Sequence, residues 1–286
     1  MKDIILLPNP TRDIGFKITK QVNEILKGFG RNALFCPVPE GGEEIEEIPE
    51  LPVSDFDSAI DSAEMIITFG GDGTILRAAR LVADRPVPIL GINMGGKGFM
   101  AELETDDIKL VACAARGEYE LGYRMMLDAE IWRGGKAVSG DFALNDVVIR
   151  GINKVIEVTL YGDGSRISSF EGDGAVIATP TGSTAYSMSA GGPVVEPLAH
   201  NIIVTPICAH VLEAKPYVLM SDRNVTVELG FSKSNPAYMS VDGCEPVPVF
   251  SGDEIRIRKS EKSTCFVRLS DKSFYKKVSE KLGEKV

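Results

Sequence analysis

The sequence predicts an N-terminal α/β domain with a parallel, Rossmann-like sheet and a C-terminal, all-β domain of β-sandwich type. Apolar strands alternate with amphipathic helices through the first hundred residues, which favours a parallel sheet covered on both faces. Beyond about residue 119, short segments with alternating polarity are separated by turn residues, which is typical of antiparallel strands. We expect domains at residues 1–118 and 119–260, and a last strand and tail at 261–286 that packs back on the first domain.

The elements of the first domain follow from the spacing of apolar residues along the chain. An apolar strand at Ile4–Leu7 opens the domain, and an amphipathic stretch from Asp13 to Lys27 predicts a helix. The acidic stretch Glu40–Glu50 is expected to be a solvated loop. The further elements expected are a strand at Ala33–Pro37, a short helix at Asp55–Ala63, a buried strand at Met65–Phe69, a helix at Thr74–Ala83 and a strand at Val87–Ile92.

The second domain is predicted as a series of short strands separated by glycine-containing turns at 133–135 and 161–164. The strands expected are Met125–Trp132, Lys136–Val138, Phe142–Arg150, Val155–Tyr161, Val225–Gly230, Met239–Val241 and Glu254–Arg258. An apolar run at Cys265–Leu269 predicts one more strand, and a basic, helical tail follows it.

Composition narrows the class of protein. The net charge of −10 opposes binding to nucleic acid, although it leaves room for a small anionic ligand held by backbone N–H groups. No apolar run reaches the roughly 18 residues that span a bilayer, and the N-terminus does not read as a signal peptide, so we expect a cytoplasmic protein without a membrane partner. The five cysteines are scattered singly, which indicates reduced thiols and no structural zinc site.

The stretch Gly70-Gly71-Asp72-Gly73-Thr74 lies between a buried strand and an amphipathic helix. Its glycines permit backbone torsions that side chains forbid, and they let a ligand approach the main chain closely. The following helix presents free N–H groups and the positive end of its dipole, which favour a phosphate. The simpler alternative is a glycine-rich turn in which Asp72 only caps the helix.

Three further stretches extend this pattern. A second glycine-rich turn, Met94–Met100, follows the next strand, so two such turns meet at the ligand-binding edge of the sheet. The loop Thr179–Ser187 has six hydroxyl residues in nine positions and follows the apolar strand Ala175–Ala178; it suits a sugar or amide, or is a surface turn. The pair Asn145-Asp146 can hold a nucleobase edge and ribose hydroxyls, or can simply form a turn.

The combination of GGDGT, an Asn-acid pair before a strand and DG-x₄-TPTGSTAY resembles the NAD kinase family. The likeness runs from residue 1 to about residue 260. GGDGT alone is also found in diacylglycerol and sphingosine kinases and in phosphofructokinase-like folds, whereas the downstream TPTGSTAY is specific. The resemblance implies a kinase that moves the γ-phosphoryl group of ATP onto the adenosine ribose 2′-hydroxyl of NAD, with NAD bound between the two domains and Mg²⁺ on the donor phosphates.

The resemblance also implies roles for individual residues. Asp72 matches the general base on the 2′-hydroxyl, a task that needs a carboxylate within hydrogen-bond reach of the proton. The positions that match contacts to ATP phosphates are Gly70, Gly71, Gly73, Thr74 and Arg77. The positions that match contacts to NAD are Asp72, Gly73, Phe99, Asn145, Asp146, Lys154, Asp173, Thr181, Thr184, Ala185, Tyr186 and Ser189. The family likeness further suggests homodimers or homotetramers.

Four features depart from the family pattern. Asp146 stands where Glu is commoner, Lys97 stands where an apolar residue is usual, and Glu171 stands where Arg or Lys is frequent. The segment His210–Pro216 lacks the usual Ser and Arg. These departures leave open the choice between NAD and NADH and the identity of the phosphoryl donor. The sequence does not indicate whether NADP or NADPH feeds back on the enzyme.

Two other functions fit part of the pattern. A lipid kinase of the diacylglycerol type shares GGDGT, but the acidic composition and the lack of a basic amphipathic helix oppose it. A non-catalytic NAD-binding sensor could use the same fold, but it would not need Asp72.

Overall fold

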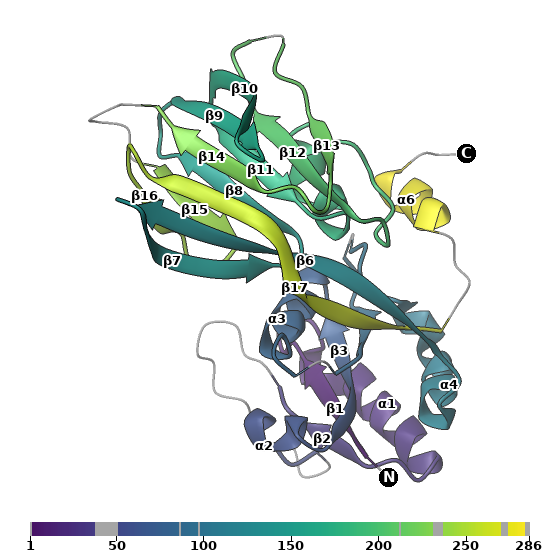
Figure 1. Cartoon of the computed structure of the whole chain (residues 1–286). Coiled ribbons are helices and arrows are strands. Elements are labelled where there is room, and N and C mark those ends of the chain that lie inside the picture. The colour runs from purple at the N-terminus through teal and green to yellow at the C-terminus, as the bar shows by residue number, and fades with distance from the viewer. Residues whose placement is uncertain are drawn as a thin grey trace. The chain divides into compact units, whose positions relative to one another are not determined.

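The computed structural model describes residues 2–37, 51–85, 87–96, 98–211, 213–230, 237–269 and 274–283 (Figure 1). The chain divides into two compact units, Met1–Tyr123 with Thr264–Val286, and Arg124–Ser263. The division falls inside two long strands, β6 and β17, which contribute residues to both units. The acidic stretch 40–50 and Lys97, for which the sequence raised expectations, lie outside the described residues.

The first unit is built on a parallel sheet with the strand order β2-β1-β3-β4. Strand β5 and the end of β17 pair in parallel with β4 as well. The elements of this unit are β1 (Asp3–Pro8), η1 (Ile14–Phe16), α1 (Lys17–Gly28), β2 (Ala33–Phe35), α2 (Phe56–Ile60), β3 (Ala63–Gly70), α3 (Asp72–Leu81), β4 (Ile89–Asn93), β5 (Leu103–Glu104), η2 (Thr105–Leu110), α4 (Val111–Arg116) and α6 (Phe274–Leu282). A parallel sheet collects the carboxyl ends of its strands at one edge, so the turns after β3 and β4 are neighbours.

Helices cover both faces of this sheet, as the alternation of elements predicts (Figure 1). On one face, Leu90 and Ile92 of β4 share a buried cluster with Val22 of α1 and Val111 of α4. On the opposite face, α3 lies so close to β4 that a Cβ atom at Gly91 would come 2.6 Å from the Cδ1 of Ile75. Strand residues point alternately to the two faces, so these buried contacts hold the strand ends rigidly.

The second unit consists of two antiparallel sheets. One has the order β13-β12-β11-β8-β15-β16, and the other contains β10-β9-β14-β17 together with β6 and β7. A cluster of fully buried aliphatic side chains from both sheets fills the space between them, which is the expected sandwich core. The strands are β6 (Glu120–Arg133), β7 (Lys136–Ala143), β8 (Asp146–Gly151), β9 (Ile156–Gly162), β10 (Ser165–Gly172), β11 (Gly174–Ala178), β12 (Asn201–Ile207), β13 (Tyr217–Met220), β14 (Val225–Leu229), β15 (Ala237–Val241), β16 (Val247–Val249) and β17 (Glu254–Arg268), and a short turn of η3 (Thr181–Thr184) and α5 (Tyr186–Ser189) follows β11.

Two sequence-based strand predictions were wrong. The segment Phe142–Arg150 is not one strand: β7 ends at Ala143 and β8 begins at Asp146, because the intervening backbone N–H groups bind the Asp242 carboxylate. The strands expected at Glu254–Arg258 and Cys265–Leu269 are a single strand, β17, whose polar middle still alternates in burial and contains the buried Ser260.

The helix expected between Asp13 and Lys27 is confirmed. The amphipathic stretch from Asp13 to Lys27 forms η1 and α1, and the Asp13 carboxylate accepts hydrogen bonds from the N–H groups of Ile18 and Thr19 at 3.0 and 2.9 Å. All five cysteines are free thiols. Among the described residues, none of the helices has both the length and the apolar character needed to cross a bilayer.

We predict that Leu6→Ala lowers the free energy of unfolding by about 2–5 kcal/mol, because Leu6 is fully buried in the core of the parallel sheet. Leu121→Ala is the matched control, since that leucine is 44% exposed, and it should change stability by less than about 0.5 kcal/mol. Urea unfolding of the two variants checks this, and equal losses would contradict the placement of Leu6.

Candidate functional site

The first part of the candidate site is the turn between β3 and α3. Strand β3 ends at Gly70, Gly71 caps α3, and Asp72 is the first residue of that helix. The half-buried Asp72 carboxylate accepts two backbone hydrogen bonds, from the N–H of Phe99 to Oδ2 at 2.8 Å and from the N–H of Met100 to Oδ1 at 3.1 Å. Asp72 therefore joins the GGDGT turn to the turn after β4, which we call the second glycine turn (described residues 94–96 and 98–100).

The glycines at two of these positions are required by close packing. A Cβ atom at Gly98 would lie 2.5 Å from Oδ1 of Asp72, and one at Gly70 would overlap the hydroxyl of Thr74. An added methyl group at either position would force these polar groups apart. By contrast, a Cβ atom at Gly71 or Gly73 would meet open space, so those two glycines leave the N-terminal end of α3 accessible.

The environment makes Asp72 a stronger base than an ordinary aspartate. Burial raises the pKa of the Asp72 carboxyl, and the hydrogen bonds from Phe99 and Met100 and the positive charges of Lys281 and Lys277 oppose this rise without cancelling it. A carboxylate held by two fixed N–H groups keeps further lone pairs for a hydroxyl proton. The turn thus combines a fixed, basic carboxylate with the N-terminal end of a helix.

A second candidate region, separate from the first, lies at the start of β8 in the second unit. The Asp242 carboxylate accepts hydrogen bonds from the backbone N–H groups of Leu144, Asn145 and Asp146 at 2.7, 2.8 and 3.0 Å. These three bonds fix the backbone that carries the Asn-Asp pair. Sequence analysis did not single out Asp242; its signal is the Val241-Asp242-Gly243 turn after β15, where Asp242 has φ +49°.

The hydroxyl-rich loop packs directly on this pair. The N–H of Thr179 donates to the carbonyl oxygen of Asn145 at 2.8 Å, and the Thr179 hydroxyl donates to the carbonyl oxygen of Leu144 at 2.6 Å. A Cβ atom at Gly182 would overlap the Asn145 carbonyl, so the loop requires glycine there. The TPTGSTAY segment is therefore not an independent surface turn.

Two buried polar atoms in this region have no hydrogen-bond partner among the described residues, namely Oδ1 of Asn145 and Oγ1 of Thr181. Buried polar groups in proteins are nearly always satisfied, so such atoms indicate a bound molecule or ordered water. The neighbouring Asp146 is also poorly solvated. Burial and the charge of Asp242 raise its pKa to about 7, and a hydrogen bond from the Tyr186 N–H only partly offsets this.

The structure does not bring all expected residues of this unit together. Asp146 pairs with Ala178 at one end of the β8–β11 ladder, whereas Gly174, the neighbour of Asp173, pairs with Arg150 at the other end. The two ends are four residues, or roughly 14 Å, apart at about 3.4 Å per residue. Thr181, Thr184, Ala185 and Tyr186 lie at the Asp146 end, and Asp173 and the exposed Lys154 lie at the other end.

The remaining expected residues lie on or beside these elements. Thr74 is buried in the first turn of α3, and Arg77 is exposed one turn further along. Phe99 is half-buried in the second glycine turn, and Ser189 is exposed at the end of α5. The Asp173 carboxylate lies 3.6 Å from the guanidinium of Arg150.

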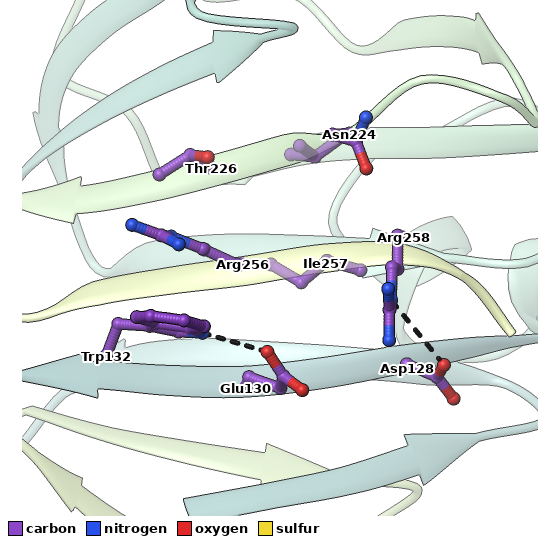
Figure 2. A pocket seen from close by; sticks show the side chains of 9 residues that line it. Asp128, Glu130, Trp132, Asn224, Thr226, Arg256, Ile257 and Arg258 are labelled. Carbon is purple, nitrogen blue, oxygen red and sulfur yellow. Dashed lines mark hydrogen bonds and ion pairs between the residues drawn. The ribbon is translucent and has the colours of Figure 1, made fainter. Parts of the chain in front are cut away.

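A pocket of about 330 Å³ on the second unit contains none of the expected site residues (Figure 2). Its walls are side chains of β6, β14 and β17, which contact one another. The guanidinium of Arg256 lies 4.0 Å from the ring centre of Trp132, whose Nε1 donates to Glu130 at 2.8 Å, and Arg258 lies 3.7 Å from Asp128. The polar side chains of this pocket therefore pair with one another, and we do not include the pocket in the candidate site.

In the described part of the chain, no group of three or more His, Cys, Asp or Glu side chains is arranged to hold a metal ion.

Two family models match the chain. A model described as the ATP-NAD kinase N-terminal domain matches residues 37–116, and one described as the ATP-NAD kinase C-terminal domain matches residues 144–269. The chain is similar to the NAD kinase of Ruminiclostridium cellulolyticum, with 34% identity over 100% of this chain and 99% of that protein. It is 38% identical to the NAD kinase of Acetivibrio thermocellus, over 96% of this chain and 95% of that protein.

Solved structures with the same fold include two kinases. A crystal structure of an NAD kinase from Archaeoglobus fulgidus in complex with ATP is similar with a TM-score of 0.72 and 26% identity, over 98% of each chain. The crystal structure of yeast NADH kinase complexed with NADH has a TM-score of 0.82 at 23% identity, over 99% of this chain and 88% of that chain, and it supports the fold alone.

We predict that Asp146→Asn stabilises the protein at pH 8 more than at pH 5. The folded carboxyl holds its proton up to about pH 7, while its ordinary pKa is 3.8, so ionisation penalises the folded state increasingly as pH rises through this window. Asparagine never ionises; its oxygen can accept the Tyr186 N–H, and its amide group can face Asp242. Urea unfolding at both pH values measures the difference.

The matched control is Asp61→Asn, because the Asp61 side chain is 76% exposed. The control should show the same small effect at pH 5 and pH 8. A stability difference for Asp146→Asn that does not grow with pH would contradict the burial of an ionising carboxyl at this position.

Proposed function

The chain belongs to the NAD kinase family, and we propose that it transfers the γ-phosphoryl group of ATP to the adenosine ribose 2′-hydroxyl of NAD, producing NADP and ADP. The observation that carries the catalytic part of this proposal is the Asp72 carboxylate, which is basic, half-buried and fixed by the N–H groups of Phe99 and Met100. A helix N-terminal end adjoins it, where phosphates bind favourably.

In the proposed reaction, the ribose 2′-oxygen attacks the γ-phosphorus of ATP, and the Asp72 carboxylate accepts the proton that leaves this 2′-hydroxyl. The bond between that phosphorus and the β–γ bridging oxygen breaks, and ADP leaves with the electron pair. Such transfers depend on positioning and charge neutralisation more than on covalent help from the protein. The Asp72 carboxylate contributes to positioning, because it cannot turn away from the attacking oxygen without losing its two hydrogen bonds.

The donor phosphates are proposed to bind at the N-terminal end of α3. Gly71 and Gly73 leave open space there, and Thr74 and the exposed Arg77 add a hydroxyl and a positive charge, with Gly70 allowing the close turn. We propose that Mg²⁺ or another divalent cation binds as a complex with the donor phosphates. Among the described residues, no group of three or more His, Cys, Asp or Glu side chains could hold the cation without them. The cation would neutralise charge on the transferred group.

Contacts to NAD are proposed for the region at the start of β8 and, in the first unit, for Asp72, Gly73 and Phe99. Oδ1 of Asn145 and Oγ1 of Thr181 are acceptors that lack partners among the described residues, and Asp146 offers a carboxyl to a ribose hydroxyl. Tyr186 can stack on a ring, and Thr184, Ala185 and Ser189 continue the same loop. Asp173 and Lys154, at the other end of the ladder, would contact a different part of the dinucleotide.

Three finer statements complete the proposal. We propose a cytoplasmic enzyme that works as a homodimer or homotetramer, as the family likeness suggests. A lipid kinase is not favoured, because both ATP-NAD kinase domain models match and not GGDGT alone. A non-catalytic sensor is not favoured either, because the carboxylate needed for chemistry is present and basic.

We predict that the purified protein, given NAD, ATP and Mg²⁺, makes NADP that an NADP-specific dehydrogenase detects. Asp72→Asn should lower kcat by about 10²–10⁴-fold, because the amide cannot accept the proton. Asp61→Asn, the exposed control, should retain wild-type activity. A folded Asp72→Asn variant that keeps more than about a tenth of the activity would remove Asp72 from the role of base.

We also predict that Asn145→Ala raises the KM for NAD by about tenfold or more, since each lost hydrogen bond to a buried group costs roughly 1–3 kcal/mol. The KM for ATP should stay unchanged. Folding should be preserved, because Oδ1 of Asn145 has no partner among the described residues.

Asn224→Ala in the pocket of Figure 2 is the matched control. It should alter neither KM. An increased KM for NAD in Asn224→Ala, with Asn145→Ala normal, would move NAD binding to that pocket.

A further inference from the structure

Helix α6 (Figure 1) contacts the chain on either side of the N–H groups of Phe99 and Met100, at the carbonyl oxygens of Gly96 and Ala101. Nζ of Lys281 lies 3.4 Å from the carbonyl oxygen of Gly96, before the turn's N–H donors, and 2.8 Å from Oε1 of Glu104. Nζ of Lys277 donates to the carbonyl oxygen of Ala101, directly after those donors, at 2.6 Å. The two lysines therefore bracket the short segment that holds the Asp72 carboxylate.

The position of that segment decides the orientation of Asp72. The N–H groups of Phe99 and Met100 bind one carboxylate oxygen each, and Gly98 lies so close that a methyl group there would touch Oδ1. A shift of the segment would carry both hydrogen bonds with it. Whatever fixes its two ends also fixes the carboxylate.

The way α6 is attached argues against a purely structural tail. None of its residues Phe274–Leu282 is fully buried, although some are partly buried, so no fully buried side chain of its own holds the helix. Lys277 and Lys281 instead make specific hydrogen bonds to backbone carbonyl oxygens. For Lys277 this contact carries a desolvation cost. Burial lowers the pKa of Lys277, although the charges of Glu102, Glu104 and Asp72 oppose this.

Glu104 extends the contact into the parallel sheet. Its carboxylate receives Lys281 on Oε1 and the Nδ2 amide of Asn93 on Oε2, at 2.8 and 2.7 Å. Asn93 is the last residue of β4, and its amide also donates to the carbonyl oxygen of Gly96 at 2.9 Å. The helix is thus connected, through side chains, to the strand end from which the turn begins.

We propose that α6 is a strap for the catalytic carboxylate, in which Lys277 and Lys281 act as positioning residues. They hold the second glycine turn so that its N–H groups keep Asp72 aligned with the ribose hydroxyl, and they place positive charge beside it. This inference rests on the proposed function of Asp72 as the base. Neither lysine needs to touch a substrate for this role.

The charged groups around Asp72 fix the direction of its pH response. Lys281 and Lys277 of α6 favour the ionised form of Asp72. Glu102 and Glu104 favour the charged form of Lys277. Removing either lysine raises the pKa of Asp72. The base works only when ionised, so the fall in kcat on the acid side must then begin at a higher pH.

The test uses the full-length protein with Lys277→Met, Lys281→Met and the double variant. We expect kcat to fall by about 10- to 100-fold in the double variant, the range for a misplacement of up to about 1 Å. The KM values for NAD and ATP should change less than kcat does, and the acid limb of the kcat profile should move to higher pH. Lys281→Arg, which keeps a charged donor, should retain most of the activity.

Lys276→Met is the matched control on the same helix, because Lys276 is 71% exposed and lies 3.9 Å from Glu280 rather than against the turn. It should leave kcat and its pH profile unchanged. Urea unfolding of each variant separates loss of fold from loss of alignment. If the double variant does not fold, the single variants and Lys277→Gln carry the same test.

The role of α6 and the role of Asp72 as general base can fail separately. If Asp72→Asn is inactive but both lysine variants keep wild-type kcat and pH profile, the strap is wrong and the general base stands. If Asp72→Asn is fully active, the proposed base itself is wrong. A fall in kcat with no change in the acid limb, in a folded variant, would also overturn the strap.

Discussion

The hydrogen bonds from Phe99 and Met100 to the Asp72 carboxylate are the constraint on which the first unit's chemistry depends. They join the turns that follow two neighbouring parallel strands, β3 and β4, so the sheet fixes the distance that these bonds must bridge. The close approach leaves no space for a Cβ atom at Gly98. Gly98 is thus a packing requirement of this carboxylate and Gly70 one of Thr74, whereas Gly71 and Gly73 leave the N-terminal end of α3 open.

The two acidic residues of the candidate site are made basic in different ways. Asp72 is desolvated but receives two N–H groups and two nearby positive charges, so its pKa rises only in part. Asp146 is desolvated and faces a second carboxylate, that of Asp242, so its pKa rises to about 7. Asp72 is consequently suited to remain ionised and accept a proton, whereas Asp146 is suited to exchange hydrogen bonds with a neutral hydroxyl.

Local sequence signals predicted most of the first unit because each element there is coded by its own residues. The strand Met65–Phe69, the glycine turn and the helix from Thr74 follow one another along the chain, and the structure differs from the prediction by one or two residues at their ends. The second unit was harder. The break between β7 and β8 depends on Asp242, nearly a hundred residues away, and its local sign is the Asn145-Asp146 pair, which the sequence left open as a turn.

For the same reason, the sequence did not predict that residues of α6 belong to the site. The sequence predicts a basic helix that packs back on the first domain, but the role of its lysines depends on which groups of that domain they meet. Lys277 and Lys281 are one helical turn apart and so share a face, while Lys276 and Glu280 form a separate pair on the same helix. Spacing alone could not tell which pair faces the protein. Lys277 and Lys281 face the protein because they donate to the carbonyl oxygens of Ala101 and Gly96. These oxygens lie on either side of the N–H groups that bind Asp72.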